Sequence, residues 1–283
     1  MQNIGLVVNW SKIEAIKVAN DLVNWFTARG VKVSLQENCI NTIKNTQVLN
    51  HSTASEVDCI LVLGGDGTLL NTAGEYVKHS VPLLGVNLGQ LGFLTSLEIP
   101  VLYEGIEWLL CGNYSVEKRM MLEAIVVRNR TKVRSFYALN DIVITKGAFS
   151  RLIRLEMFIS NQYIDTYPAD GLIISTSTGS TAYSLSAGGP IVAPDLEVMI
   201  VTPICPHTLY SRPMVISPYQ EVAVSLLSSH AEVMLTVDGQ QGFKLDEKDQ
   251  IFIKKAPVFT KIIRFPKQSF FDILREKLRD GSR

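Results

Sequence analysis

Asp58-Cys59-Ile60-Leu61-Val62-Leu63-Gly64-Gly65-Asp66-Gly67-Thr68 is the stretch of sequence that decides the fold. Residues 58–63 are apolar enough to be buried on both faces, which is typical of a central strand in a parallel sheet. A turn follows at the glycines, and a helix is predicted over residues 68–77. Because ligands of open α/β sheets bind beyond the carboxyl ends of the strands, we expect a ligand site at residues 64–68.

The glycines of this turn let backbone N–H groups approach phosphate oxygens without a Cβ in the way. A phosphoryl donor is therefore expected against Gly64, Gly65, Gly67 and Thr68. Asp66 would repel phosphate unless it takes a proton from an attacking hydroxyl or faces the phosphate through Mg²⁺. The alternative is a tight turn in which Asp66 is only the N-cap of the helix. The chain has neither the G-x-G-x-x-G fingerprint nor a Walker A pattern, so an ordinary dehydrogenase and a P-loop kinase are not indicated.

The rest of the first third of the chain repeats this alternation of strand and helix. Strands are expected at residues 4–8, 31–35 and 82–86. A helix is expected between a cap at Ser11 and a close at Gly30. Residues 36–56 are expected to form a loop with a short helix. This order predicts an open parallel α/β sheet.

After about Gly112 the apolar segments become short and many alternate, which predicts a β-rich, antiparallel half. Turns are expected at residues 129–131, 160–162 and 238–242. An amphipathic helix is expected over residues 268–279. The strands predicted between these features are 122–127, 133–139, 142–145, 154–159, 172–175, 222–227, 233–237 and 250–254.

The composition is that of a globular protein and excludes several classes of function. Hydrophobic residues make up 47% of the 283, and 27 basic residues balance 27 acidic ones. Zero net charge leaves no global basic field for nucleic acid or an anionic membrane. No run approaches the ~20 apolar residues of a membrane span, and residues 4–8 lack the basic start of a signal peptide. We expect a cytoplasmic enzyme with no nucleic-acid or membrane partner.

Cysteine and histidine are too scattered to predict a metal site in the chain. No C-x-x-C or H-E-x-x-H pattern is present. No residue is therefore assigned to a metal, and reduced, mostly packed cysteines are expected. The cysteines are Cys39, Cys59, Cys111 and Cys205.

Three later segments, read beside the Gly-Gly-Asp-Gly-Thr turn, resemble one enzyme family. The turn itself is shared by NAD kinases, diacylglycerol and sphingosine kinases and, in shorter form, 6-phosphofructokinases. Gly85-Val86-Asn87-Leu88-Gly89-Gln90-Leu91-Gly92-Phe93-Leu94-Thr95 resembles the NAD kinase segment G-[VI]-N-x-G-x-L-G-F-L, with a structural hairpin as the alternative. Asn140-Asp141 resembles the family's Asn-acid pair, although such a pair alone is more often a turn. Asp170-Gly171 with Ser175-Thr176-Ser177-Thr178-Gly179-Ser180-Thr181-Ala182-Tyr183-Ser184 is similar to the family's D-G…T-G-S-T-A-Y block.

The resemblance to NAD kinases extends over nearly the whole chain, because Asp238-Gly239-Gln240 and the Phe270-Phe271 tail also fit the family. It implies a Rossmann-like α/β domain at residues 1–115 and a β-rich, sandwich-like domain at residues 116–264. It also implies a C-terminal helix at residues 265–283 that returns to the first domain. A homodimer or homotetramer is implied, with the NAD site between the domains and completed by a neighbouring subunit.

The activity implied is transfer of a phosphoryl group from ATP or polyphosphate to the 2′-hydroxyl of the adenosine ribose of NAD. Asp66 is the candidate general base, and Mg²⁺ or another divalent cation would accompany the donor. The sequence leaves open the preferred donor, the choice between NAD and NADH, and the size of the oligomer. The residues expected to bind NAD are Asp66, Gly67, Asn71, Asn140, Asp141, Arg151, Asp170, Thr178, Thr181, Ala182, Tyr183, Ser184 and Gln240.

One position departs from the family pattern. Many members have an arginine two residues before the Asp-Gly pair, where this chain has Pro168. Arg151 and Arg154 are the candidates to replace it. Two rival functions stay open: a lipid kinase of the diacylglycerol type, for which we find no membrane-binding motif, and a catalytically inert NAD-binding regulator, which the intact Asp66 disfavours.

Overall fold

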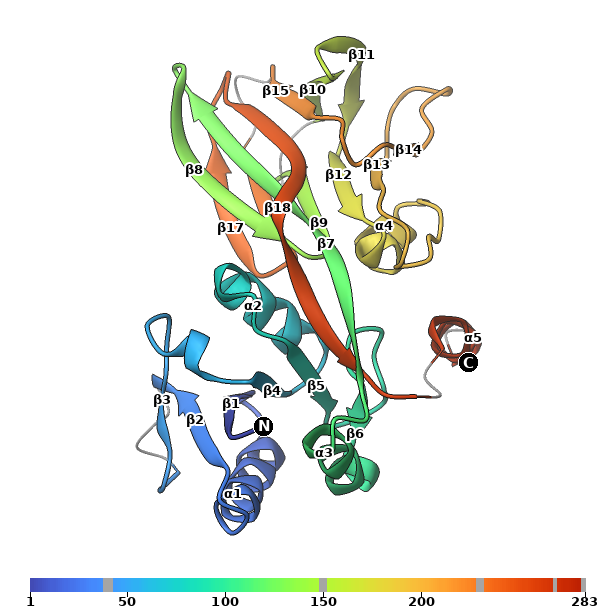
Figure 1. The fold of residues 1–283 in the computed structure, drawn as a ribbon. Helices are drawn as coiled ribbons and strands as arrows, with labels where there is room; N and C mark the ends of the chain where they lie inside the picture. Colours follow the sequence, from blue (N-terminus) through green and yellow to red (C-terminus); the bar gives the residue numbers. More distant parts are fainter. Residues whose placement is uncertain (38–42, 148–151, 228–231, 267–268, 281–283) are drawn as a thin grey trace. The chain divides into compact units, whose positions relative to one another are not determined.

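The computed structural model describes residues 1–37, 43–147, 152–227, 232–266 and 269–280 (Figure 1). The chain divides into two compact units. Unit 1 comprises Met1–Lys118 and Thr260–Arg283, and unit 2 comprises Arg119–Phe259. No helix in the described part of the chain is long and apolar enough to cross a membrane.

Unit 1 is built on a parallel sheet with β4 near its centre. The strands pair in the order β5-β4-β1-β2-β3, and β6 pairs in parallel with β5. All five residues of β4 are buried, as expected of a strand with neighbours on both edges and helices on both faces. The strands are β1 Asn3–Val8, β2 Lys32–Gln36, β3 Gln47–Leu49, β4 Cys59–Leu63, β5 Leu83–Asn87 and β6 Leu97–Glu98.

Among its described residues, unit 1 has the α-helices α1 Ile13–Thr27, α2 Asp66–Tyr76, α3 Leu102–Leu110 and α5 Phe270–Asp280. The expected cap at Ser11 is wrong, because its hydroxyl bonds Asn9 Oδ1 at 2.6 Å and the N-cap position is Lys12. Gly30 closes the α1 turn as expected, with φ of +73°. The ring of Phe270 lies 5.9 Å from that of Phe93, which attaches α5 within this unit.

Unit 2 is a sandwich of antiparallel strands. One sheet has the order β14-β13-β12-β9-β16-β17. The other strands pair as β15 with β10 and β18, β10 with β11, and β7 with β8. One core holds the two sheets together, with Leu122, Leu155, Ile174 and Leu235 wholly buried in it. The strands are β7 Ser115–Arg128, β8 Thr131–Ala138, β9 Asp141–Lys146, β10 Ile153–Ile159, β11 Gln162–Ala169, β12 Gly171–Thr176, β13 Met199–Ile204, β14 Met214–Ile216, β15 Val222–Leu226, β16 Val233–Val237, β17 Gln241–Leu245 and β18 Gln250–Arg264.

The fold class expected from the sequence is confirmed, whereas several strands were not predicted. The three expected turns carry positive φ angles, for example at Asn129, Ser160 and Asp238. Strand β18 runs on to Arg264, well past the predicted end at Lys254, and contributes to both units. The strands absent from the prediction are β3, β6, β11, β13, β14 and β17. Polar residues weaken the alternation of apolar and polar residues in β3 and β17. These two segments form strands because they pair with β2 and β16.

Candidate active site

Unit 1 carries one candidate site, at the N-terminus of helix α2. Gly65 is the N-cap, and the helix begins at Asp66, two residues before the predicted start. The first N–H groups of a helix have no partner within it, and the helix dipole favours anions there. The N–H of Gly64 instead donates to Val86 O at 3.0 Å, so it is occupied within the sheet. A Cβ on Gly64 would lie 2.2 Å from Thr68 Oγ1, which explains the glycine by close packing.

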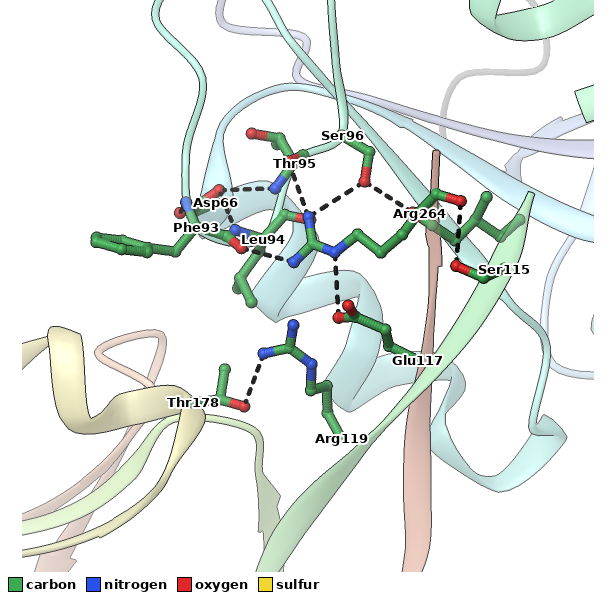
Figure 2. A network of polar contacts seen from close by, with 11 residues as sticks. Asp66, Phe93, Leu94, Thr95, Ser96, Ser115, Glu117, Arg119, Thr178 and Arg264 are labelled. Carbon is green, nitrogen blue, oxygen red and sulfur yellow. Dashed lines mark hydrogen bonds and ion pairs between the residues drawn. The ribbon is translucent and has the colours of Figure 1, made fainter. Parts of the chain in front are cut away.

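The Asp66 carboxylate faces the segment that follows β5 (Figure 2). Its Oδ2 accepts the N–H of Phe93 at 2.9 Å, and its Oδ1 accepts those of Leu94 and Thr95 at 3.2 Å each. The interpretation of Asp66 as an N-cap is therefore wrong. An ionised carboxylate offers about four lone-pair directions. Three are occupied, and the one left for a ligand lies on Oδ2.

Gly92 is required by this arrangement, since a Cβ there would lie 2.1 Å from Asp66 Oδ1. The hairpin alternative for residues 85–95 is wrong, because β5 and β6 on either side of the turn pair in parallel, with Val86 opposite Leu97. The resemblance pointed to this segment for its sequence alone. The structure gives it a physical role, which is to hold the Asp66 carboxylate.

Arg264, which the sequence did not single out, binds the other side of the same segment (Figure 2). Its guanidinium donates to Phe93 O at 2.7 Å, Leu94 O at 3.4 Å and Thr95 O at 3.1 Å. It also donates to Ser96 Oγ at 3.2 Å, and its Nε pairs with Glu117 at 3.2 Å. Arg264 is buried. No local motif marks it, because its partners lie elsewhere in the sequence.

Unit 2 carries a candidate site of its own, around the Asn140-Asp141 pair. The carboxylate of Asp238, in the turn between β16 and β17, accepts the N–H groups of Leu139, Asn140 and Asp141 at 2.8, 2.7 and 3.0 Å. Burial, with the charge of Asp238 as the smaller cause, raises the pKa of Asp141 to about 7. Burial also raises the pKa of Asp238 to about 6, against the opposing effect of its three N–H donors. Asp141 is buried, and this burial favours the neutral form of its carboxyl.

The Thr-Gly-Ser-Thr-Ala-Tyr block packs directly against this pair. It forms the 3-10 helix η5 Thr178–Thr181 and the short helix α4 Tyr183–Ser186. Thr176 Oγ1 donates to Leu139 O at 2.6 Å and accepts the N–H of Gly179 at 3.1 Å. A Cβ on Gly179 would lie 2.2 Å from Asn140 O. Residues 139–141 and 176–186, which were identified as separate motifs in the sequence, thus form one local structure.

The side chains of the block differ in what they can offer to a ligand. Tyr183 is 45% exposed and Thr181 and Ala182 are half-buried, so all three are accessible. Ser184 is wholly buried, and its hydroxyl lies 2.9 Å from Thr202 Oγ1, which makes it a support of the block. Buried Arg119, also missed by the sequence, donates to Thr178 Oγ1 at 3.4 Å (Figure 2).

An ion pair lies next to the start of β12. Asp170 Oδ1 pairs with Lys146 Nζ at 2.8 Å, and both side chains remain partly exposed. Pro168 lies directly across from Arg154 in the β10–β11 pair. Arg154, one of the two candidates to replace the arginine that this chain lacks at position 168, therefore lies next to that position. Arg151 lies outside the described residues.

Asn71 and Gln240 are both exposed. Asn71 lies on α2 of unit 1, and Gln240 lies in the β16–β17 turn of unit 2.

Across the ranges that the structure describes, no three or more His, Cys, Asp or Glu side chains cluster to hold a metal ion. Two of the described cysteines, Cys111 and Cys205, are exposed, and Cys59 is buried. The expectation of mostly packed cysteines is therefore wrong for these two, and Cys39 lies outside the described residues.

Comparison with known sequences agrees with this geometry. Residues 4–114 match the ATP-NAD kinase N-terminal domain, and residues 139–265 match the ATP-NAD kinase C-terminal domain. The chain is 47% identical to the NAD kinase of Caldanaerobacter subterraneus subsp. tengcongensis over 99% of its own length and 100% of that protein. It is 48% identical to the NAD kinase of Moorella thermoacetica over 99% of its length and 90% of that protein.

Two solved structures share the fold. The yeast NADH kinase in complex with NADH has a TM-score of 0.87 at 25% identity, covering 97% of this chain and 86% of that one. An NAD kinase from Archaeoglobus fulgidus in complex with ATP has a TM-score of 0.76 at 24% identity, covering 99% of both chains.

Proposed function

The chain belongs to the NAD kinase family, and on that basis we propose that it transfers the γ-phosphoryl group of ATP to the 2′-hydroxyl of the adenosine ribose of NAD. The observation that carries the proposal is the Asp66 carboxylate, which three backbone N–H groups orient at the start of a helix. This placement combines an anion-binding helix end with an acceptor of protons.

We assign the donor phosphates to the start of α2. The N–H groups of the N-cap Gly65 and of the first two helix residues, Asp66 and Gly67, would bind phosphate oxygens there. Gly64 contributes by close packing, because its own N–H is bound to Val86 O. Thr68, whose N–H donates to Gly65 O, adds its hydroxyl to this group of residues.

We assign the proton of the acceptor hydroxyl to Asp66 Oδ2. A positioned base contributes roughly 10²–10⁴-fold to such a transfer. The two oxygens of Asp66 accept three N–H groups, and Oδ2 has the remaining direction. As the hydroxyl attacks the γ-phosphorus, its proton passes to Oδ2. The bond from the γ-phosphorus to the β-γ bridging oxygen breaks, and ADP is released.

We assign the dinucleotide to unit 2. The Asn140 amide, held by Asp238 through its backbone, binds ribose hydroxyls with Asp141 beside it. Tyr183 offers an exposed aromatic face to the adenine, and Thr178, Thr181 and Ala182 line its edge. Asp170, paired with Lys146, takes a polar end of the dinucleotide, with Gln240 as a further contact.

A divalent cation suits the donor. Mg²⁺ commonly binds through substrate phosphates and one or two carboxylates and keeps several waters, so it needs no cage of protein ligands. That fits a site in which the donor phosphates and water would supply the ligands, because the remaining lone-pair direction of Asp66 is assigned to the acceptor hydroxyl. When bound, the ion neutralises charge on the transferred phosphoryl group.

We further propose that the enzyme acts as a homo-oligomer. Unit 2 exposes large apolar side chains on neighbouring segments, and such patches mark interaction surfaces. These residues are Leu209 at 96% exposure, Tyr210 at 73%, Val215 at 52% and Tyr219 at 87%.

Product analysis by mass spectrometry tests the function. NAD and Mg²⁺ are incubated with ATP, another nucleoside triphosphate or polyphosphate, and NADH replaces NAD in a parallel series. NADP formed with ATP supports the proposal, and the other arms identify the preferred donor and acceptor. A product from diacylglycerol and none from NAD would favour the lipid kinase instead. Binding of NAD without any product would favour the inert regulator.

A further inference from the structure

We propose that Arg264 is a positioning residue for the reaction, which acts on the Asp66 carboxylate through the peptide groups of residues 93–95. The inference rests on the proposed role of Asp66 as the base. Arg264 itself is not assigned to the substrate. It holds the carbonyl side of a segment whose N–H side holds Asp66.

Two peptide groups are bound at both ends. The peptide that joins Phe93 to Leu94 accepts from Arg264 at its C=O, at 2.7 Å, and donates to Asp66 at its N–H, at 3.2 Å. The peptide that joins Leu94 to Thr95 does the same, at 3.4 Å and 3.2 Å. A trans peptide is planar with C=O and N–H pointing in opposite directions. The position of the guanidinium therefore fixes the direction in which each N–H points at Asp66.

Arginine is suited to this task by its geometry. The guanidinium is planar, carries five N–H donors in a fixed fork and stays charged. In Arg264 the terminal nitrogens reach three successive carbonyl oxygens and Ser96 Oγ, while Nε reaches Glu117. A lysine ammonium is a single point with three donors and cannot hold the same set of carbonyls in one plane.

The consequence for catalysis concerns Asp66 Oδ2, which has the one remaining lone-pair direction. If the N–H groups rotate, the carboxylate rotates with them and this direction no longer meets the acceptor hydroxyl. A misplacement of about 1 Å at a reacting group costs on the order of 10²-fold in rate. Loss of Arg264 should therefore lower kcat and leave the KM for NAD near its original value.

The test is a double-mutant cycle on turnover with Arg264→Gln, Asp66→Asn and the double variant, each measured as NADP formed by mass spectrometry. We expect Arg264→Gln to lose at least ~10-fold in kcat in the wild-type background and less than ~2-fold in the Asp66→Asn background, because residues that act as a unit are not additive. Arg264→Lys should recover part of the loss. The matched control is Arg128→Gln, which removes an arginine bound to the buried Asp249 in unit 2 and should leave kcat unchanged.

The outcomes separate this inference from the proposed function. If Asp66→Asn keeps its turnover, the base assignment fails, and this inference fails with it. If Asp66→Asn is impaired but the Arg264 loss is the same in both backgrounds, the base assignment stands and the positioning role is wrong. If Arg264→Gln does not fold, as judged by circular dichroism, Arg264→Lys takes its place in the same cycle, with the same two readings.

Discussion

Asp66 and Arg264 bind opposite ends of the same two peptide groups. The carboxylate accepts the N–H groups of Leu94 and Thr95, and the guanidinium donates to the C=O groups of Phe93 and Leu94 that precede them. A charge on each side polarises the hydrogen bonds between them in the same sense, which strengthens both. The residue at the centre of the proposed chemistry is therefore held by backbone, and the backbone is held by an arginine from the end of β18.

Replacing Asp66 by asparagine should lower kcat by at least ~10²-fold, because the base is lost and an amide NH₂ would face an N–H donor. NAD binding, measured by calorimetry, should persist, since the residues proposed for the nucleoside belong mainly to unit 2. Steady-state turnover near that of the wild type would exclude Asp66 as the base.

Replacing Gly92 by alanine should lower kcat although it removes no polar group. Its Cβ would lie 2.1 Å from Asp66 Oδ1 and displace the carboxylate. Gly74→Ala is the control, because nothing lies within 4 Å of a Cβ there and alanine favours a helix by about 0.8–1.0 kcal/mol. Equal turnover of the two variants would mean that the orientation of Asp66 does not limit the reaction.

Replacing Gly179 by alanine should raise the KM for NAD. The new Cβ would lie 2.2 Å from Asn140 O and push apart the two segments proposed to bind the nucleoside. Gly242→Ala provides the control in the same unit, where the Cβ meets Met234 at an ordinary 3.4 Å. An unchanged KM in Gly179→Ala would count against a nucleoside site at this contact.

Burial of Asp141 should make the stability of the protein depend on pH. The pKa of this carboxyl is raised from 3.8 to about 7, so the folded chain retains a proton that the unfolded chain releases. The retained proton stabilises the folded state fully below about pH 4, and this stabilisation is lost as the pH rises toward about 7. Asp141→Asn mimics the protonated form, so its Tm minus that of the wild type should be higher at about pH 8 than at about pH 5. A Tm difference independent of pH would contradict the shifted pKa.

Thiol labelling should distinguish the cysteines by burial. Iodoacetamide should modify the exposed Cys111 and Cys205 in the folded protein. Cys59 should react only after unfolding, because burial, with the charge of Asp58 as the smaller cause, raises the pKa of its thiol to about 12. Peptide mapping by mass spectrometry measures this, and early labelling of Cys59 would show that β4 opens in the native state.

Local patterns were enough to predict the framework of the fold. The apolar run 59–63 became β4, and the glycines after it became the turn into α2, because burial on both faces and a tight strand-to-helix turn demand these residue types. The antiparallel turns at Asn129 and Ser160 were predictable for the same reason, since their residues tolerate positive φ. Strand β14 was not, because three residues carry no clear period.

The sequence by itself determined which residue types are proposed to bind a phosphorylated ligand: a Gly-Gly-Asp-Gly turn after a buried strand, an Asn-Asp pair and a hydroxyl-rich block. Only the tertiary structure decided what holds them. Asp66 takes its orientation from residues 93–95 and Arg264, and Asn140 takes its orientation from Asp238. These contacts join residues far apart along the chain, and such hydrogen bonds leave no local period or spacing in the sequence.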